Sequence, residues 1–322
     1  MKVVLFQDKE IKDVNQLLNY ILMNNDFIST NEILSEIKLF SDELPKRIRQ
    51  EFYDFKLKEN TLSLCLRGFP LDQNKIGLTP TCIPSPEDKK IATREEVLHF
   101  LFATLLGEIF TWSSIQNGNI INEVIPIKEH EDKPISSGAN YYLDLHTEDA
   151  FHPYSGDYLG LLCIRNPTQT PITLTSLSNI NFDENLKKIL FENRFRIGVN
   201  IAHNIPKASE FSAILFGNFE NPYIRLNLNN IGTENNDIEA KHALDKLTHL
   251  LKANQTNFIP EPGDLIYIDN FRVVHAREQF VPKYDGHDRW LKRLYITNDL
   301  RKSRDIRHSS SSRVIDISEQ PD

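Results

Sequence analysis

Apolar side chains in the first 110 residues recur with the spacing of α-helices. In the segment DVNQLLNYILMNNDF, the apolar residues between Val14 and Leu22 lie three or four positions apart, which places them on one face of a helix. A second helix is predicted for TNEILSEIKLF, where Thr30 is a candidate cap. A third is predicted for residues 93–110, because a T-x-x-E capping box precedes an apolar periodic run. Between these helices, residues 61–71 alternate like a strand and residues 72–93 read as a long polar loop.

Beyond residue 110 the pattern changes to short apolar segments separated by Gly, Pro and Asn. The strand-like segments are NGNIINEVIPI, ANYYLDLHTE, YLGLLCIRNP, TPITLTSLS, PGDLIYIDNFRVVHARE and RWLKRLYITNDL, with helical stretches predicted at 182–194 and 239–253. Many short strands with helical insertions are typical of a barrel or jelly roll. We therefore predict a single domain, mainly β with flanking helices, whose core is a double-stranded β-helix (jelly roll). A mainly helical region, 1–110, packs on a core of 111–305, and the polar residues 306–322 form a flexible tail.

Composition removes several classes of function and location. The net charge of −8 disfavours a surface that follows the phosphates of a nucleic acid, and no glycine pattern matches a phosphate-binding loop. The three cysteines are too few for a disulfide framework and suggest a reducing compartment. We recognise no signal peptide or membrane-spanning run. The expectation is a cytoplasmic protein with neither a nucleic acid nor a membrane as its partner.

The strand-like segment LDLHTE carries the first candidate for metal chemistry. Residues two apart on a strand point to the same face, so His146 and Glu148 project side by side. An imidazole and a carboxylate on one face form two-thirds of the facial triad that binds non-haem Fe(II). A second H-x-D pattern, His130 and Asp132, lies in a charged, proline-flanked segment and is interpreted as a solvated loop.

A third ligand has to come from another segment, and His275 in RVVHARE is the best candidate. A lone histidine beside an apolar strand is more often a packing residue, but the following segment DGHDRWLKRLYITNDLR adds Arg289 and Arg293. Their even spacing places them on one face of a strand, and arginine binds carboxylates through two parallel hydrogen bonds. The alternative is a surface strand with solubilising charge, which the neighbouring Trp290 makes less attractive.

Together, HTEDAFHP…YLGLLCIRNP and PGDLIYIDNFRVVHARE…DGHDRWLKRLYITNDLR resemble the clavaminate synthase-like family of Fe(II)/2-oxoglutarate-dependent dioxygenases, over about residues 105–305. The family includes asparagine, arginine and lysine hydroxylases. The resemblance implies Fe(II), 2-oxoglutarate and O2 as cofactor and co-substrates. It implies His146, Glu148 and His275 as metal ligands. Arg289 and Thr173 would bind the distal carboxylate of 2-oxoglutarate.

The resemblance also implies a free amino acid as the substrate. Arg293 would bind its α-carboxylate, Gln116 its amino group, and Ser136 and Ser137 would add polar contacts. Arginine hydroxylases of this family grip the substrate side chain with a D-x-D pair, where this chain has Asn227 and Asn229. Loss of two carboxylates disfavours arginine and leaves Lys, Asn, Gln or Glu-like side chains open. Alternatively, the two asparagines are turn residues in a shifted register.

Three other readings remain at this point. In the first, the amino acid is tethered to a carrier protein or otherwise modified, and Arg293 then has no free α-carboxylate to bind. In the second, the chain is a non-catalytic, cupin-like metal-binding sensor, which the arginine beside the predicted triad argues against. Two histidines and a carboxylate also suit a hydrolytic zinc site, where the arginine pair has no obvious role.

Overall fold

The computed structural model describes residues 1–24, 30–58, 60–85, 92–203 and 210–317. Its α-helices are α1 (Asp8–Asn24), α2 (Thr30–Ser41), α3 (Lys46–Leu57), α4 (Gln73–Ile76), α5 (Arg94–Ala103), α6 (Glu184–Leu190) and α7 (Ile238–Ala253). Short 3₁₀ turns are η1 (Gln116–Gly118), η2 (Lys128–His130), η3 (Leu177–Asn179), η4 (Ile201–His203) and η5 (Leu300–Ile306).

The strands outnumber the helices, as the predicted fold class requires. They are β1 (Lys2–Leu5), β2 (Ser63–Arg67), β3 (Glu108–Trp112), β4 (Asn122–Val124), β5 (Leu143–His146), β6 (Tyr158–Arg165), β7 (Ile172–Ser176), β8 (Phe195–Ile197), β9 (Phe211–Ser212), β10 (Leu215–Gly217), β11 (Pro222–Ile224), β12 (Ile231–Thr233), β13 (Thr256–Phe258), β14 (Leu265–Asp269), β15 (Val273–Arg277), β16 (Trp290–Thr297) and β17 (Val314–Ile315).

Two sheets form the centre of the molecule. The main sheet has eight strands in the order β1-β2-β14-β6-β16-β3-β17, with β4 also paired to β16. A second sheet has the order β13-β7-β15-β5. The sheets pack face to face, since one cluster of buried residues joins Leu159 and Leu161 of β6 to Ile172 and Leu174 of β7. Smaller sheets, β12-β8-β9 and β10-β11, complete the fold.

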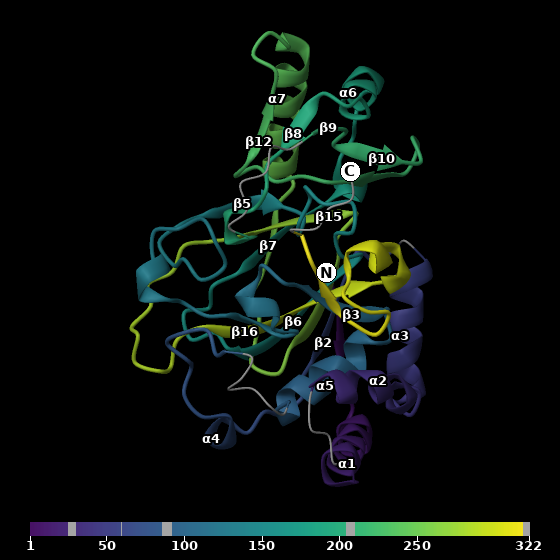
Figure 1. Ribbon diagram of the computed structural model, residues 1–322, viewed down its shortest axis with the longest axis vertical. Coiled ribbons are helices and arrows are strands. Elements are labelled where there is room, and N and C mark those ends of the chain that lie inside the picture. Colours follow the sequence, from purple (N-terminus) through teal and green to yellow (C-terminus); the bar gives the residue numbers. More distant parts are fainter. Residues whose placement is uncertain (25–29, 59, 86–91, 204–209, 318–322) are drawn as a thin grey trace.

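Helices cover the outer faces of both sheets. In Figure 1, α1, α2 and α5 lie at one end of the molecule and α6 and α7 at the other. At the first end, Phe52 of α3 and Phe102 of α5 lie in one buried cluster with Leu162 of β6 in the main sheet. At the other end, α6 and α7 pack on the four-stranded sheet β13-β7-β15-β5, called the small sheet below, where Leu247 of α7 joins Val274 of β15 in one cluster. Strand β6 is therefore buried on both faces, which explains its continuous apolar run.

Two boundaries differ from the sequence prediction. The helix expected over 93–110 keeps its capping box at Thr93 and Glu96 but ends at Ala103, and β3 follows. Gly107 explains the change, because a Cβ there would lie 2.3 Å from the carbonyl oxygen of Thr297 on β16. Only glycine allows this close approach, which brings β3 into the main sheet.

The second difference concerns the end of the chain, where a flexible tail over 306–322 was expected. In its described part, 306–317, the segment instead packs against the main sheet. Strand β17 pairs in parallel with β3, and Ile306, Ile315 and Ile317 lie in a buried cluster with Trp112. The apolar residues spaced two apart in RVIDISE were the sign of this strand. Residues 318–322 lie outside the described part.

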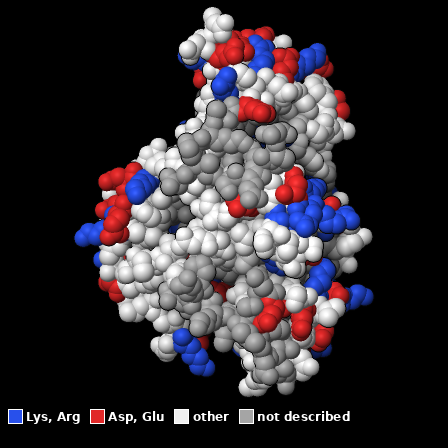
Figure 2. All heavy atoms as spheres, viewed as in Figure 1, with Lys and Arg blue, Asp and Glu red and all other residues white. Residues whose placement is uncertain are grey.

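On the face shown in Figure 2, Lys and Arg side chains lie among Asp and Glu side chains. Three cysteines, Cys65, Cys82 and Cys163, are free thiols, and the first and last are buried. In the described parts of the chain, no helix is long and apolar enough to cross a membrane.

One buried histidine of the helical layer should make stability depend on pH. His99 of α5 is fully buried, with Nδ1 3.3 Å from the Tyr267 hydroxyl oxygen, and burial lowers its pKa to about 3. An unfolded chain has a histidine pKa near ~6.5. Between these values the unfolded state binds one more proton, so the free energy of unfolding falls as the pH falls, by up to about 1.4 kcal/mol per pH unit.

We expect His99→Gln to remove this contribution from the slope of unfolding free energy against pH, between roughly pH 6 and pH 4. Urea titrations at successive pH values measure the slope. His249→Gln serves as the control, because His249 is exposed on α7. A slope that is equal in the wild type and His99→Gln would contradict the prediction.

Candidate metal and co-substrate site

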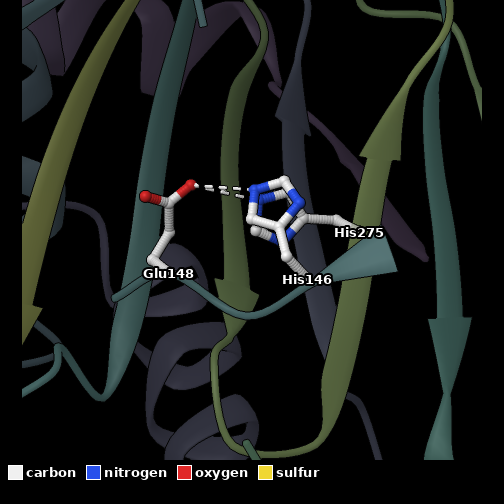
Figure 3. Close-up of side chains that lie close together, drawn as sticks. All are labelled: His146, Glu148 and His275. Atoms are coloured by element: carbon white, nitrogen blue, oxygen red, sulfur yellow. Dashed lines mark hydrogen bonds and ion pairs between the residues drawn. The ribbon is translucent and has the colours of Figure 1, made fainter. Parts of the chain in front are cut away.

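The predicted metal ligands meet between the two central sheets. His146 ends β5 and pairs with His275 of β15 across the small sheet, and Glu148 follows two residues later. The ligand atoms of all three residues lie within 4.8 Å of one another, and all three side chains are buried. Glu148 Oε1 is 3.2 Å from His275 Nε2 and 3.5 Å from His146 Nε2. Figure 3 shows the Glu148 carboxylate facing both rings.

The surroundings prepare these side chains for a divalent cation. His146 Nδ1 donates a hydrogen bond to the carbonyl of Asp144 at 2.8 Å, which leaves the Nε2 lone pair facing the other ligands. Burial and the neighbouring His146 lower the pKa of His275 to about 4, so its imidazole is neutral near neutral pH. The backbone amide of Glu148 donates to Asn270 Oδ1 at 2.7 Å. Two imidazoles and one carboxylate fit Fe(II).

Arg293 is the cation next to this cluster. Lying on β16, its Nη1 is 3.2 Å from Glu148 Oε2 and its Nη2 is 3.3 Å from Asn122 Oδ1. Although burial opposes it, the Arg293 charge and the two imidazoles hold the pKa of Glu148 well below its usual range. The metal carboxylate is therefore ionised, and a carboxylate bound to Arg293 would lie beside the metal ligands.

Arg289 is fully buried just before β16 and lines a cavity that reaches the metal ligands. Burial lowers its pKa to about 10. Its Nε has no acceptor, and its ring contact is with Phe280, 5.7 Å from the guanidinium carbon. The other side chains around the cavity are largely apolar: Val124, Leu143, Leu159, Leu161, Ile172, Ala276 and Leu291, with Ser136, Arg277 and Arg293.

The structure does not support the assignment of Thr173 to the distal carboxylate of 2-oxoglutarate. Leu174 lies opposite His275 in the β7–β15 pair, so these two side chains share the inner face. Thr173 then points to the outer face, where its hydroxyl donates to Asn257 Oδ1 at 2.8 Å. On the inner face the neighbouring position is Ile172, which lines the cavity. An apolar residue therefore occupies the place where a hydroxyl was expected.

Most of the side chains that were expected to contact the amino end of the substrate form hydrogen bonds within the protein instead. Both ends of the Gln116 side-chain amide bind the backbone of Glu123, at 2.8 Å each. The Ser137 hydroxyl is 2.8 Å from His130 Nδ1. Ser136 alone of these three residues lines the cavity. The His130 segment is thus tied to its own loop, in agreement with its interpretation as a loop rather than a ligand.

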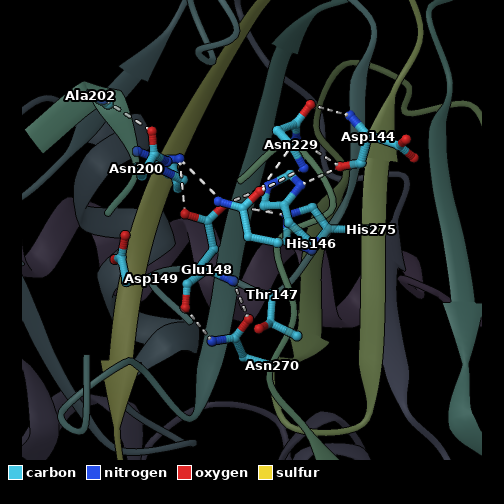
Figure 4. Close-up of polar contacts among 12 residues, drawn as sticks. Asp144, His146, Thr147, Glu148, Asp149, Asn200, Ala202, Asn229, Asn270 and His275 are labelled. Carbon is cyan, nitrogen blue, oxygen red and sulfur yellow. Dashed lines mark hydrogen bonds and ion pairs between the residues drawn. The ribbon is translucent and has the colours of Figure 1, made fainter. Parts of the chain in front are cut away.

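Asn227 and Asn229 lie beside the metal cluster. Asn227 forms an isolated bridge with His146, and its Oδ1 accepts a hydrogen bond from the Asn229 amide at 3.1 Å. Asn229 Oδ1 accepts from the Asp144 amide at 3.3 Å, so Asn229 and His146 both contact Asp144 (Figure 4). Both asparagines are half-buried and lie in a turn, which the Asn230 amide closes by donating to the Asn227 carbonyl at 2.9 Å. Their contact with a substrate side chain stays a prediction.

Sequence reasoning missed a buried polar group directly behind Glu148. Asp149 has a positive φ of 51° and accepts hydrogen bonds from the Trp112 indole at 2.5 Å and from His203 Nε2 at 2.9 Å. The Ser114 hydroxyl lies 2.7 Å from the other ring nitrogen of His203. This group fixes the turn that follows the metal carboxylate. The only sign in the sequence was the acidic residue immediately after Glu148.

Comparisons with known proteins agree with this geometry. The sequence profile described as "Taurine catabolism dioxygenase TauD, TfdA family" matches residues 186–295. An enduracididine β-hydroxylase of Streptomyces hygroscopicus is 32% identical over 96% of this chain and 98% of its own length. An L-ornithine/L-arginine 3-hydroxylase of Catenulispora acidiphila is 31% identical over 84% of this chain and 87% of its own length.

A crystal structure of the non-haem iron oxygenase OrfP with Fe and α-ketoglutaric acid has a TM-score of 0.89 and 32% identity, and covers 98% of this chain and 100% of that one. These findings confirm the resemblance that the motifs carried, and with it the expectation of Fe(II) and 2-oxoglutarate. A chain that matches such relatives over nearly its whole length belongs to their family, the TauD/TfdA dioxygenases that act with Fe(II), 2-oxoglutarate and O2.

Proposed function

We propose that this protein hydroxylates an unactivated C–H bond of a free L-amino acid with a polar side chain, at a metal held by His146, Glu148 and His275 on a double-stranded β-helix core. The observation that carries the proposal is the position of Arg293, 3.2 Å from Glu148. A buried guanidinium beside the metal ligands suits the α-carboxylate of an amino acid. A thioester on a carrier protein has no such group.

Different residues around the site position 2-oxoglutarate and the substrate. Fe(II) with 2-oxoglutarate and O2 supplies the oxidising chemistry when bound. Arg289 holds the distal carboxylate of 2-oxoglutarate, and Arg293 holds the substrate so that its side-chain carbons lie near the metal. The apolar cavity wall keeps water away from both carboxylates, which strengthens their contacts with arginine.

Asn227 and Asn229 bear on which amino acid is used. Amides pair with neutral or singly placed polar groups and offer no net charge to a guanidinium. They favour a lysine-, asparagine-, glutamine- or glutamate-like side chain over arginine, although the two relatives above carry names of basic amino acids. We therefore expect a lower kcat/KM for arginine than for a substrate with a neutral or ammonium side chain.

Oxygenation of an amino-acid panel tests this order. Protein loaded with Fe(II) and 2-oxoglutarate without air is mixed with single amino acids, air is admitted, and succinate and hydroxylated product are measured by mass spectrometry. We expect product from one polar amino acid. The kcat/KM for arginine should be lower than the value for that amino acid by at least about tenfold, given the free energy of a hydrogen bond to a charged group.

The double variant Asn227→Asp/Asn229→Asp is the matched comparison, and it should raise the kcat/KM for arginine relative to the best substrate of the wild type. Arginine as the best wild-type substrate would refute the specificity and leave the hydroxylase assignment intact. Succinate in every reaction without any hydroxylated product would instead point to a modified or tethered amino acid.

A further inference from the structure

Two buried guanidinium groups, those of Arg277 and Arg289, face the cavity beside the metal cluster. Arg277 ends β15, two residues after His275, and Arg289 lies directly before β16. Both line the same cavity. Their guanidinium carbons lie 5.3 Å and 5.7 Å from the centre of one ring, that of Phe280. Two cations from different segments thus meet at a single aromatic side chain.

Neither of these arginines has a carboxylate partner among the residues that the structure describes. Arg277 donates to the backbone carbonyls of Gly138 and Tyr141 through Nη2 and to that of Glu278 through Nη1, whereas no described residue accepts a hydrogen bond from Arg289. The Nε atoms of both arginines are buried without an acceptor. Burying a charge without an opposite charge is costly, so two such groups side by side call for an anion between them.

The rest of the cavity wall offers few side chains that could bind this anion. Thr173 lies on the outer face of β7, and the inner positions around the cavity are apolar, among them Leu161, Ile172 and Leu291. Apart from the arginines and the metal ligands, Ser136 is the polar side chain recorded along the wall. A carboxylate that reaches Arg289 therefore meets Arg277 as its second charged neighbour, where a hydroxyl was expected.

We propose that Arg277 and Arg289 together form a two-arginine clamp for the distal carboxylate of 2-oxoglutarate. The Arg289 guanidinium is a planar fork that can donate two parallel hydrogen bonds to a carboxylate, whereas Arg277, whose Nη2 already donates to two carbonyls, adds its charge and the hydrogen bond of its unpaired Nε. The clamp rests on the proposed function, since it assumes that 2-oxoglutarate is the molecule in this cavity. It adds Arg277, a residue whose bonds to backbone carbonyls would otherwise suggest a purely structural role.

Calorimetric titration without O2 distinguishes carboxylate binding by Arg277 from a purely structural role. Fe(II)-loaded protein is titrated with 2-oxoglutarate and with 2-oxopentanoate, which keeps the keto acid and carries a methyl group in place of the distal carboxylate. We expect the wild type to prefer 2-oxoglutarate by about 100-fold or more, and Arg277→Gln to weaken 2-oxoglutarate by about 10- to 100-fold. Binding of 2-oxopentanoate should change by no more than about twofold.

Arg165→Gln is the control, because Arg165 also holds a loop through a backbone carbonyl, that of Gly77, but lies outside the cavity. Its preference for 2-oxoglutarate should equal that of the wild type. If Arg277→Gln fails to fold, Arg277→Lys replaces it, since the ammonium keeps the charge and loses the fork. It should show a smaller loss, again confined to 2-oxoglutarate.

Equal weakening of both keto acids in the Arg277 variants would overturn the clamp and leave Arg277 as a support for the loop around Gly138. Unchanged binding of both would overturn it as well. A wild type that binds 2-oxoglutarate no better than 2-oxopentanoate would refute the clamp while the proposed function stands. A wild type that binds neither keto acid would refute the proposed function and the clamp with it.

Discussion

Replacing Glu148 with alanine should abolish hydroxylation and sharply reduce iron binding. The carboxylate lies within 3.5 Å of both imidazoles and is the only anionic member of the cluster found in the described residues. Loss of a group that merely supports a metal ligand already costs about 10- to 100-fold in metal affinity, so loss of the ligand itself should exceed that range. Iron content after anaerobic loading and succinate formation measure the effect.

The same variant should also be less stable, because Glu148 is the ion-pair partner of the buried Arg293. Removing one member of a buried pair costs about 3–5 kcal/mol. Asp144→Asn is the control, since the Asp144 carboxylate pairs with Lys252 nearer the surface and Asp144 contacts His146 only through its backbone carbonyl. Iron binding by Glu148→Ala at the wild-type level would show that the three side chains are not the metal site.

Replacing Lys292 with methionine should be among the most destabilising single changes in this chain. Lys292 lies beside Arg293 on β16 but points to the helical layer, where its Nζ is 2.8 Å from Glu96 Oε1 and 2.9 Å from Glu123 Oε1. At most 4% of each of these three side chains is exposed. Although burial opposes it, the two carboxylates hold the pKa of Lys292 above its usual value. We expect a loss of about 3–5 kcal/mol in unfolding free energy, measured by urea titration.

A triple variant distinguishes the charge effect from a packing effect. Glu96→Gln and Glu123→Gln, added to Lys292→Met, remove the two negative charges that the single variant leaves behind, and should restore much of the stability. Lys252→Met, which breaks the more exposed pair with Asp144, should cost no more than about 1 kcal/mol. A Lys292→Met variant as mild as Lys252→Met would contradict the expectation.

The sequence was most informative where a chemical pattern and a strand pattern coincided. His146 and Glu148 followed from the two-residue period of a strand, and His275 followed from its strand-like segment and the arginine pair after it. Thr173 failed for a related reason, because a shift of one residue along a strand moves a side chain to the other face. Spacing along the chain could not fix that register, which depends on how β7 pairs with β15.

Other features depended on contacts between segments far apart in the chain. The end of α5 was misplaced because the approach of Thr297 to Gly107 links residues that no local pattern connects. Arg277 was overlooked for the same reason, since only the fold brings it to the cavity that Arg289 also lines. The group behind Glu148 joins Trp112, Asp149 and His203, which only the fold brings together.

The order of the main sheet has a consequence for how this chain acquires its shape. Its first strand, β1, and its last, β17, occupy the two opposite edges of the sheet, so each covers backbone groups that could otherwise pair with another molecule. During synthesis on a ribosome, β3 stays unpaired until both of its partner strands, β16 and β17, have been made, about two hundred positions later. Such long-range closure is slow, and the unfinished sheet would be open to association with other nascent chains until β17 emerges.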